Sequence, residues 1–363
     1  MNTASSDGRP GSLPCSGIYR ILVCRPNHRL GNMLLITPLI AELERLYKGV
    51  EIDIVAEGPA AVDVFATFFS VRNIYCLPLR GFKHPVAFLS LLSKIRKNRY
   101  DLIIDPCLGS GFSRILTRLC RGQRKLGFDE GAGAPGLTHM LPKSMAPPHM
   151  AKRPVSLVRS FASPAVDAST DFPPLDIRLS EAERAQGQAV VRELLQVSGQ
   201  PAAKLAIGIF ANATGAKRYP GEWWREFIDA LREAFPQCGI VEIIPGHGRS
   251  MLDSRWPGYY SNKIRRMGAV MAGLDLMISA DCGVMHLAVA SRVPTIGLFA
   301  VTDANVYGPY GCGNSLLDTG GCTAREVAGK VAAAFTQCMN SGSVGARLAP
   351  QITAAPVAGG QLT

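Results

Sequence analysis

Short apolar runs that alternate with helical patterns constrain the fold of this chain more than any other feature. The first run, residues 18–24, is rich in β-forming side chains and leads through a polar loop to residues 32–47, where leucines recur every three or four positions. Pro38 is tolerated there because it lies near the expected helix start. A strand, a loop and a helix open a βαβ unit, so we expect a parallel sheet covered by helices on both faces.

The same rhythm continues along the chain. In the first half it predicts strands at 51–55, 74–77, 100–105 and 125–128 and helices at 60–69, 85–98 and 113–121. In the second half it predicts strands at 204–210, 239–244, 275–279 and 295–299 and helices at 220–235, 266–273 and 284–291. Capping-box spacing at Ser180 and Thr323 marks two further helices, which run to about Val197 and Cys338.

The length of 363 residues fits two domains of roughly 100–200 residues each. The rhythm fails at 131–148, which we interpret as a mobile loop, and again at the turn-rich segment 163–174. The predicted fold is α/β, with two Rossmann-like, doubly wound domains facing each other. We expect a disordered start at 1–17, an N-terminal domain at 18–170, a C-terminal domain at 171–340 and a disordered tail at 341–363.

The composition narrows the environment and the partners. Apolar runs are too short to cross a bilayer, and the polar start lacks a signal-peptide layout, so we expect a cytoplasmic protein. The ten cysteines are scattered without a CxxC pair, which favours reduced thiols and argues against zinc. The net charge of +11 favours an anionic partner, and the lack of a nucleic-acid-binding motif points away from nucleic acid.

Two loops that follow predicted strands carry residues suited to an anion. In an open parallel sheet, ligands bind at the carboxyl ends of the strands. The loop after Phe210 contains a hydroxyl, a glycine and two cations and could cradle a diphosphate, although an ordinary exposed turn explains it equally well. The loop after Ser279 places Asp281 at a helix start and His286 one turn inside, where a helix cap and a packing histidine are the simpler explanation.

Together these segments resemble family 9 glycosyltransferases, the ADP-heptose:lipopolysaccharide heptosyltransferases. The similar blocks are NHRLGNMLLITPLIAELER at 27–45, GAKRYPGEWW at 215–224, SADCGVMHLAVASRVPTIGLF at 279–299 and TDANVYGPYG at 302–311. They occur in the family's order and reach across most of the chain. The resemblance implies the GT-B architecture, with the acceptor held mainly by the first domain and the nucleotide sugar by the second, across a cleft.

The resemblance also implies roles for individual residues. Lys217 would neutralise the donor diphosphate, and the residues expected to bind the donor beside it are Thr214, Gly215, Met267, Asp281, Cys282, Gly283 and His286. Lys217 and Asp281 would be catalytic. The residues expected at the acceptor are Asn27, Arg29, Gly31, Asn32 and Asp105. If Lys217 and helix dipoles stabilise the leaving group, neither a metal nor a cofactor is needed.

Two departures from the family pattern bear on the mechanism. The family's presumed general base is an aspartate, and its position holds Asn32, which cannot accept a proton at neutral pH. The proton is then taken by His28, Glu57, Asp105 or Asp303, or by phosphate or water, or activity is lost. The segment 245–249 is also shorter and more basic than its family counterpart, which leaves the donor base and sugar open.

We therefore expect an inverting, metal-independent transferase that moves a heptose or related sugar from ADP-heptose or another nucleotide sugar to a lipopolysaccharide core or similar glycan. It would work at the inner face of the bacterial inner membrane, in transient contact with the anionic surface. A non-catalytic nucleotide-sugar-binding protein is the alternative suggested by Asn32. A nicotinamide-dependent dehydrogenase is disfavoured, because no GxGxxG motif follows the first strand.

Overall fold

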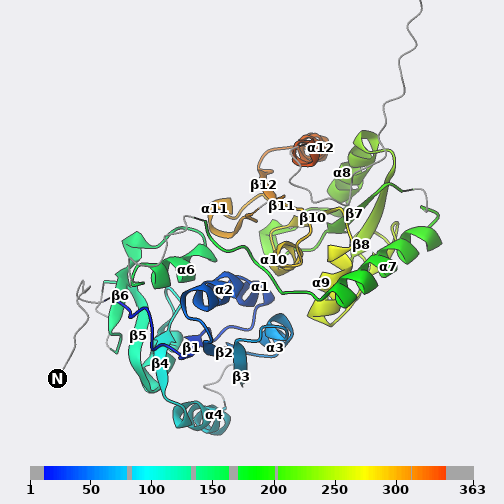
Figure 1. Cartoon of the computed structure of the whole chain (residues 1–363). Coiled ribbons are helices and arrows are strands. Elements are labelled where there is room, and N and C mark those ends of the chain that lie inside the picture. The colour runs from blue at the N-terminus through cyan, green and yellow to red at the C-terminus, as the bar shows by residue number, and fades with distance from the viewer. Residues whose placement is uncertain are drawn as a thin grey trace, which may run out of the picture.

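Two parallel six-stranded sheets form the framework of the computed structural model (Figure 1). The structure describes residues 12–79, 84–131, 136–162, 171–200, 203–311 and 313–340. The predicted tail at 341–363 lies outside this range, as do residues 1–11 of the predicted disordered start. Residue Leu13 of that start is buried, and its N–H donates to the carbonyl of Phe161, so the packed chain begins before the expected Ile18.

The first sheet has the strand order β3-β2-β1-β4-β5-β6. Its strands are β1 (Arg20–Cys24), β2 (Glu51–Glu57), β3 (Val71–Leu77), β4 (Tyr100–Ile104), β5 (Gly122–Asp129) and β6 (His139–Pro142). The second sheet has the order β12-β11-β10-β7-β8-β9. Its strands are β7 (Leu205–Phe210), β8 (Cys238–Ile243), β9 (Gly258–Tyr259), β10 (Leu276–Ala280), β11 (Thr295–Phe299) and β12 (Ser315–Asp318). Both sheets therefore have the same doubly wound topology, as predicted.

The helices cover both faces of each sheet. The first half carries α1 (Leu30–Leu34), α2 (Thr37–Leu46), α3 (Ala60–Phe65), α4 (Pro85–Lys97), α5 (Gly111–Leu119) and α6 (Lys152–Arg159). The second half carries α7 (Glu181–Val197), α8 (Gly221–Ala234), α9 (Ile264–Ala272), α10 (Gly283–Ala290), α11 (Ala304–Tyr307) and α12 (Ala324–Asn340). The capping box at Ser180 forms as predicted, with Glu183 as its acidic partner.

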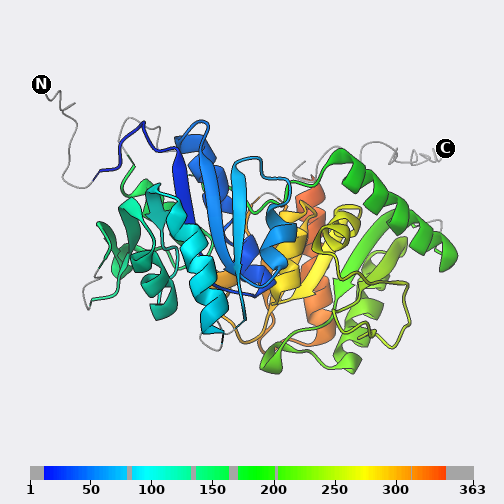
Figure 2. The same cartoon turned by 90° about the horizontal axis from the view of Figure 1, so that it is seen from below.

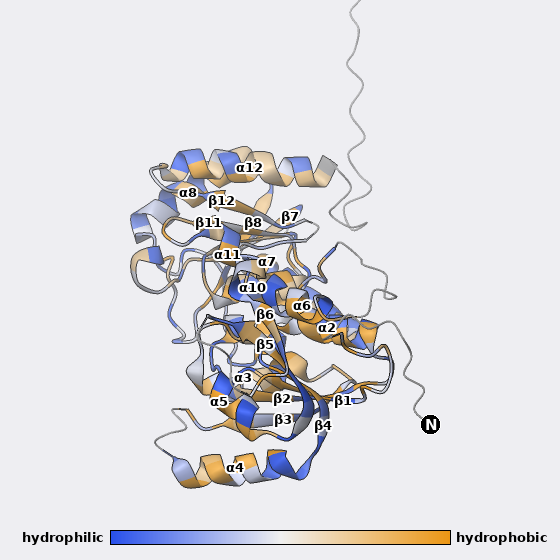
Figure 3. Cartoon of the chain, turned by 90° about the vertical axis from the view of Figure 1, so that its left-hand side faces the viewer, coloured by the Kyte–Doolittle hydropathy of each residue, from blue (hydrophilic) through white to orange (hydrophobic). Residues whose placement is uncertain are grey.

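Three hydrophobic clusters explain how these layers hold together. One lies between the first sheet and the pair α4 and α5, and a second lies between the second sheet and the pair α8 and α12. The largest continues through both halves, from α1, α2 and α3 to α7, α9 and α10. The two halves consequently meet through their inner helices, drawn in blue and yellow in the middle of Figure 2, while α4 and α12 lie at opposite ends of the molecule (Figure 3).

The single helix predicted at 32–47 is two helices. α1 ends at Leu34, and α2 begins at Thr37 with Pro38 in its first turn. A proline is favourable in a first turn, because its missing N–H has no intrahelical partner there, whereas inside a helix it removes a hydrogen bond. The apolar periodicity continues across the break, so the periodicity alone could not reveal that the helix is interrupted.

Several short elements were not predicted. The segment 131–148, expected to be a loop, contains β6, which pairs with β5 and buries Leu141, and the short 3-10 helix η2 (Lys143–Met145). Residues 132–135 of that loop and 163–170 of the turn-rich segment lie outside the described residues. Strands β9 and β12 and helices α6 and α11 were also missed.

Candidate functional site

Lys217 and Asp281 come together at the carboxyl ends of the neighbouring strands β7 and β10. Lys217 ends the 3-10 turn η3 (Gly215–Lys217), and Asp281 directly follows β10. The Lys217 Nζ donates to Asp281 Oδ2 at 2.6 Å, with the lysine side chain 33% exposed and the carboxylate 6% exposed. Strand order reverses between β7 and β10, which is where doubly wound sheets bind ligands. The structure thus places a partly open ammonium group at the expected crevice.

Thr214 and Gly215 form the rim beside this ion pair. Both are exposed, and Gly215 has a φ of 61°, a conformation that glycine adopts without strain. The Thr214 side chain makes no capping hydrogen bond at the start of η3. Its hydroxyl is therefore available to a ligand held by Lys217.

The start of α10 brings Cys282, Gly283 and His286 to the same end of the sheet. Burial raises the pKa of the Cys282 thiol, which lies 3.5 Å from Ser279 Oγ, so this cysteine is a neutral packing group. His286 is 4% exposed, and burial lowers its pKa to about 4, against an opposing effect of Asp281. Near neutral pH the imidazole is uncharged, so it can offer a hydrogen bond but no positive charge.

Two glycines let the two halves approach closely at this point. A Cβ added to Gly283 would lie 3.1 Å from the Gly31 nitrogen, and one added to Gly31 would lie 3.1 Å from the His286 ring. Helices α1 and α10 therefore cross with almost no side chain between them. This crossing places Asn32, the neighbour of Gly31, beside the donor-side residues, and so joins the predicted donor and acceptor motifs.

The Asn32 side chain is held in a polar network with Arg25 and Asn27. Its Oδ1 accepts from Arg25 Nη2 at 3.1 Å, and its Nδ2 donates to Asn27 Oδ1 at 2.9 Å. The Asn27 oxygen also accepts the backbone N–H of Arg29, whose side chain is exposed. Asn27, Arg29, Gly31 and Asn32 are thus adjacent, as expected for one face of an acceptor site.

The four proposed replacements for the missing aspartate differ in their surroundings. His28 is 56% exposed, and its Nδ1 lies 3.4 Å from Glu57 Oε2. The backbone N–H of Glu57 donates to the carbonyl of Asn27, which ties this pair to the Asn32 network. Asp303 caps α11 by accepting from the N–H of Asn305. Among the four, the His28–Glu57 pair best combines solvent access with closeness to Asn32.

Asp105 has a different position from the one expected of an acceptor contact or a base. It is completely buried and accepts hydrogen bonds from Ser113 Oγ at 2.6 Å and Arg114 Nε at 3.0 Å. Burial raises the pKa of this carboxyl, and Ser113 and Arg114 oppose that shift. Asp105 thus braces the loop after β4 and does not face solvent.

Met267 is likewise placed away from an open surface. It lies in α9, is 8% exposed, and belongs to the hydrophobic cluster that joins the two halves. Its side chain, for which the family resemblance implied a contact with the donor, is used in packing.

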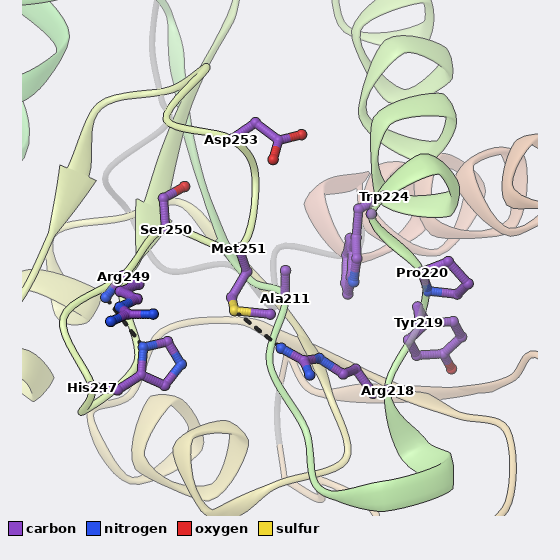
Figure 4. A pocket seen from close by; sticks show the side chains of 11 residues that line it. Ala211, Arg218, Tyr219, Pro220, Trp224, His247, Arg249, Ser250, Met251 and Asp253 are labelled. Carbon is purple, nitrogen blue, oxygen red and sulfur yellow. Dashed lines mark hydrogen bonds between the residues drawn. The ribbon is translucent and has the colours of Figure 1, made fainter.

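A cavity of about 720 Å³ opens next to η3, between the start of α8 and the loop after β8. Figure 4 shows Arg218 and Trp224 on one side and His247, Arg249 and Met251 on the other. The loop is fixed by the buried Glu242, which accepts from Ser250 Oγ and from the Met251 N–H. The sequence had marked 245–249 as unusually basic, but the joint contribution of Arg218 became visible only in the fold.

The described residues contain no group of three or more His, Cys, Asp and Glu side chains placed to hold a metal ion. Within the same part of the chain, every helix is too short or too polar to cross a membrane.

Comparison with known proteins agrees with this fold and these motifs. The family described as glycosyltransferase family 9 (heptosyltransferase) matches residues 88–241 and 262–323. Lipopolysaccharide heptosyltransferase 1 of Escherichia coli K12 is 22% identical over 306 residues, which cover 80% of this chain and 91% of the relative. The Pseudomonas aeruginosa protein of the same name is 23% identical over 311 residues, covering 80% of this chain and 81% of the relative.

Solved structures give the same result for the fold. A family 9 glycosyltransferase from Veillonella parvula superposes with a TM-score of 0.72 at 16% identity, covering 91% of this chain and 99% of that one. Escherichia coli heptosyltransferase WaaC with ADP gives 0.67 at 20% identity, covering 88% and 99%. The architecture is of the GT-B type. The chain belongs to glycosyltransferase family 9 and is a glycosyltransferase.

Proposed function

We propose that this enzyme transfers a heptose or a related sugar from a nucleotide diphosphate sugar to a lipopolysaccharide core or a similar surface glycan. ADP-heptose is the first candidate donor, because the relatives are lipopolysaccharide heptosyltransferases and one was solved with ADP. The observation that carries the proposal is the Lys217–Asp281 ion pair beside the α1–α10 crossing, where His286 lies against Gly31, the neighbour of Asn32.

The chemistry needs an acceptor hydroxyl, a leaving diphosphate and a destination for one proton. The hydroxyl oxygen bonds to the anomeric carbon while the bond from that carbon to the diphosphate breaks, and inversion follows from attack on the opposite face. Lys217 would stabilise the negative charge that develops on the departing diphosphate, helped by the amides of η3 and the start of α10. In this proposal neither the displacement at the anomeric carbon nor the proton transfer calls for a metal or an added cofactor.

Asp281 has a positioning role in this proposal. Its carboxylate holds the Lys217 ammonium at 2.6 Å, and a diphosphate would share that ammonium when it binds. Thr214 and Gly215 would line the diphosphate from the rim, and neutral His286 would contribute a hydrogen bond.

His28 is our candidate for the general base. Glu57 orients its imidazole at 3.4 Å, in the manner of a base and its orienting carboxylate. Asn32 and Asn27 would hold the acceptor, with Arg29 at the open edge. The basic cavity beside η3, lined by Arg218 and Arg249, is the proposed place for the nucleotide end of the donor.

The test is turnover of ADP-heptose with truncated lipopolysaccharide acceptors, followed as the mass shift of the glycan. Natural protein should add one sugar, and Lys217→Gln should add little. Donor binding without transfer by the natural protein, with transfer restored by Asn32→Asp, would instead indicate a binding protein derived from an enzyme. Transfer only from a different nucleotide sugar would correct the donor and leave the reaction type intact.

A further inference from the structure

Helix α4 stands out among the described helices because it leaves two large apolar side chains in solvent, where no other described helix leaves more than one. Leu92 and Ile95 pack into the cluster on the outer face of the first sheet, with Phe88 against it. On the opposite side, Val86 is 81% exposed and Leu89 is 61% exposed. In Figure 3 this helix lies at one end of the molecule, and a hydrophobic stretch is followed by a hydrophilic one along its axis.

The second half of the same helix and the residues that follow it are strongly basic. Lys94, Lys97 and Arg99 are exposed, and no ion pair to them occurs within the described residues. The sequence contains no aspartate or glutamate between Asp63 and Asp101, so no acidic side chain in this stretch offsets the cations. Exposed apolar groups are unfavourable in water, and beside unneutralised cations they favour a surface that offers both acyl chains and anionic groups.

We propose that α4 and its C-terminal flank, residues 85–99, dock the enzyme on an anionic lipid bilayer. Val86 and Leu89 would enter the headgroup boundary, and Lys94, Lys97 and Arg99 would contact lipid phosphates. Neither signal suffices alone, since two exposed aliphatic side chains bury little area and isolated charges are screened, whereas the two together give reversible attachment.

Helix α4 is suited to this role because it is packed on the sheet and hydrogen-bonded at its C-terminal end. The helix end is anchored by Asn98, whose Nδ2 donates to the hydroxyl of Tyr75 at 3.0 Å. The face that docks is opposite to the face that packs on the sheet, so attachment requires no unfolding. This inference deepens the proposed function by naming the surface from which a lipid-linked acceptor would be reached, but its test requires no turnover.

The experiment is co-sedimentation of the full chain with large unilamellar vesicles. Vesicles of phosphatidylcholine with 30% phosphatidylglycerol are compared with vesicles of pure phosphatidylcholine, at about 50 and 500 mM salt. We expect binding to the anionic vesicles at low salt and little binding in the other three conditions. The variant Lys94→Gln/Lys97→Gln/Arg99→Gln should weaken binding roughly 100-fold, at about fivefold for each cation removed.

A matched variant separates the position of the charges from their number. Arg192→Gln/Lys204→Gln/Lys330→Gln removes three exposed cations from the second half and should bind like the natural protein. Val86→Ser/Leu89→Ser, which exposes no new apolar surface, should weaken binding about tenfold. Equal losses in the two charge variants, or full binding by the α4 charge variant, would overturn the proposal.

The same variants distinguish a lipid surface from nucleic acid. If the α4 charge variant loses affinity for a DNA duplex and keeps its affinity for anionic vesicles, the patch belongs to another partner and the proposal is wrong. Vesicle binding by a preparation that transfers no sugar would leave this inference standing and count only against the proposed function.

Discussion

Lys217 and Asp281 give the sharpest test at the scale of single residues. Lys217→Gln should lower kcat by roughly 10²–10³-fold, because an electrostatic donor to the leaving group is lost. Mass-spectrometric turnover measures this, with Lys204→Gln as an exposed lysine control. If Asp281 acts only by positioning Lys217, the double variant Lys217→Gln/Asp281→Asn should be no slower than Lys217→Gln alone. A much slower double variant would show that Asp281 has its own contact with the donor.

His28 carries the second prediction at this scale. His28→Gln should lower turnover by roughly 10²–10⁴-fold if its imidazole takes the acceptor proton, and Glu57→Gln should have a smaller effect in the same direction. The substitution His84→Gln removes an exposed histidine elsewhere and should leave the rate unchanged. Asn32→Asp should change the rate by less than tenfold. A large gain from Asn32→Asp, with no loss from His28→Gln, would return the role of base to position 32.

At the scale of elements, the α1–α10 crossing depends on the absence of side chains. Gly283→Ala would place a methyl group 3.1 Å from the Gly31 nitrogen, so the helices must separate. We expect a loss of about 1–3 kcal/mol in the free energy of unfolding, measured by urea denaturation. Gly329→Ala, in the open middle of α12, should be neutral or stabilising by up to about 1 kcal/mol. Similar effects of the two substitutions would mean that the crossing tolerates expansion.

The elements also show how far sequence reasoning reaches. Helix α7, 17 residues long, was predicted because the capping-box spacing at Ser180 marks its start locally. Strand β9 has only two residues, Gly258 and Tyr259, and so carries no alternation to detect. The break before Pro38 was missed because side-chain periodicity continues across it. Pattern reports which side chains face the core, and it is insensitive to elements shorter than one period.

The same distinction holds in the candidate site: residues within one continuous stretch were predicted, and pairings between distant segments were not. The loops after β7 and β10 could be found because each is a continuous stretch with unusual residues at the end of a strand. Asp105 and Met267 were assigned contacts with ligand from the family resemblance, and their burial is set by packing between distant segments. The pairing of His28 with Glu57 and the joint cavity of Arg218 and Arg249 depend on how separate loops fold over one sheet edge.

At the scale of the whole molecule, two buried histidines lie where the halves meet. His286 of the second half faces Gly31 of the first, and His149 of the first half contacts the carbonyl of Gly308 in the second at 2.8 Å. Burial lowers the pKa of both imidazoles, to about 4 for His286. Each is therefore neutral in the folded protein at a pH where the unfolded chain already binds a proton.

The sign of the resulting pH dependence follows from this difference. Between pH 6.5 and about 4 the unfolded state binds more protons than the folded state, so the free energy of unfolding falls as the solution is acidified. For His286 the loss amounts to roughly 3 kcal/mol over the whole interval, at about 1.4 kcal/mol per pH unit. Ion-paired carboxylates such as Glu183, whose pKa Arg265 holds at about 2, lose their contribution only below their usual range near 4.5.

Urea unfolding between pH 7.5 and 5 therefore isolates the histidines from the carboxylates. The natural protein should lose stability over this range, and His286→Gln should flatten the profile even if it lowers stability at every pH. His247→Gln, at an exposed position, should keep the natural slope. An unchanged slope in His286→Gln would mean that this imidazole can be protonated without opening the interface. The contact between the halves would then deform more easily than the close approach of Gly31 and Gly283 implies.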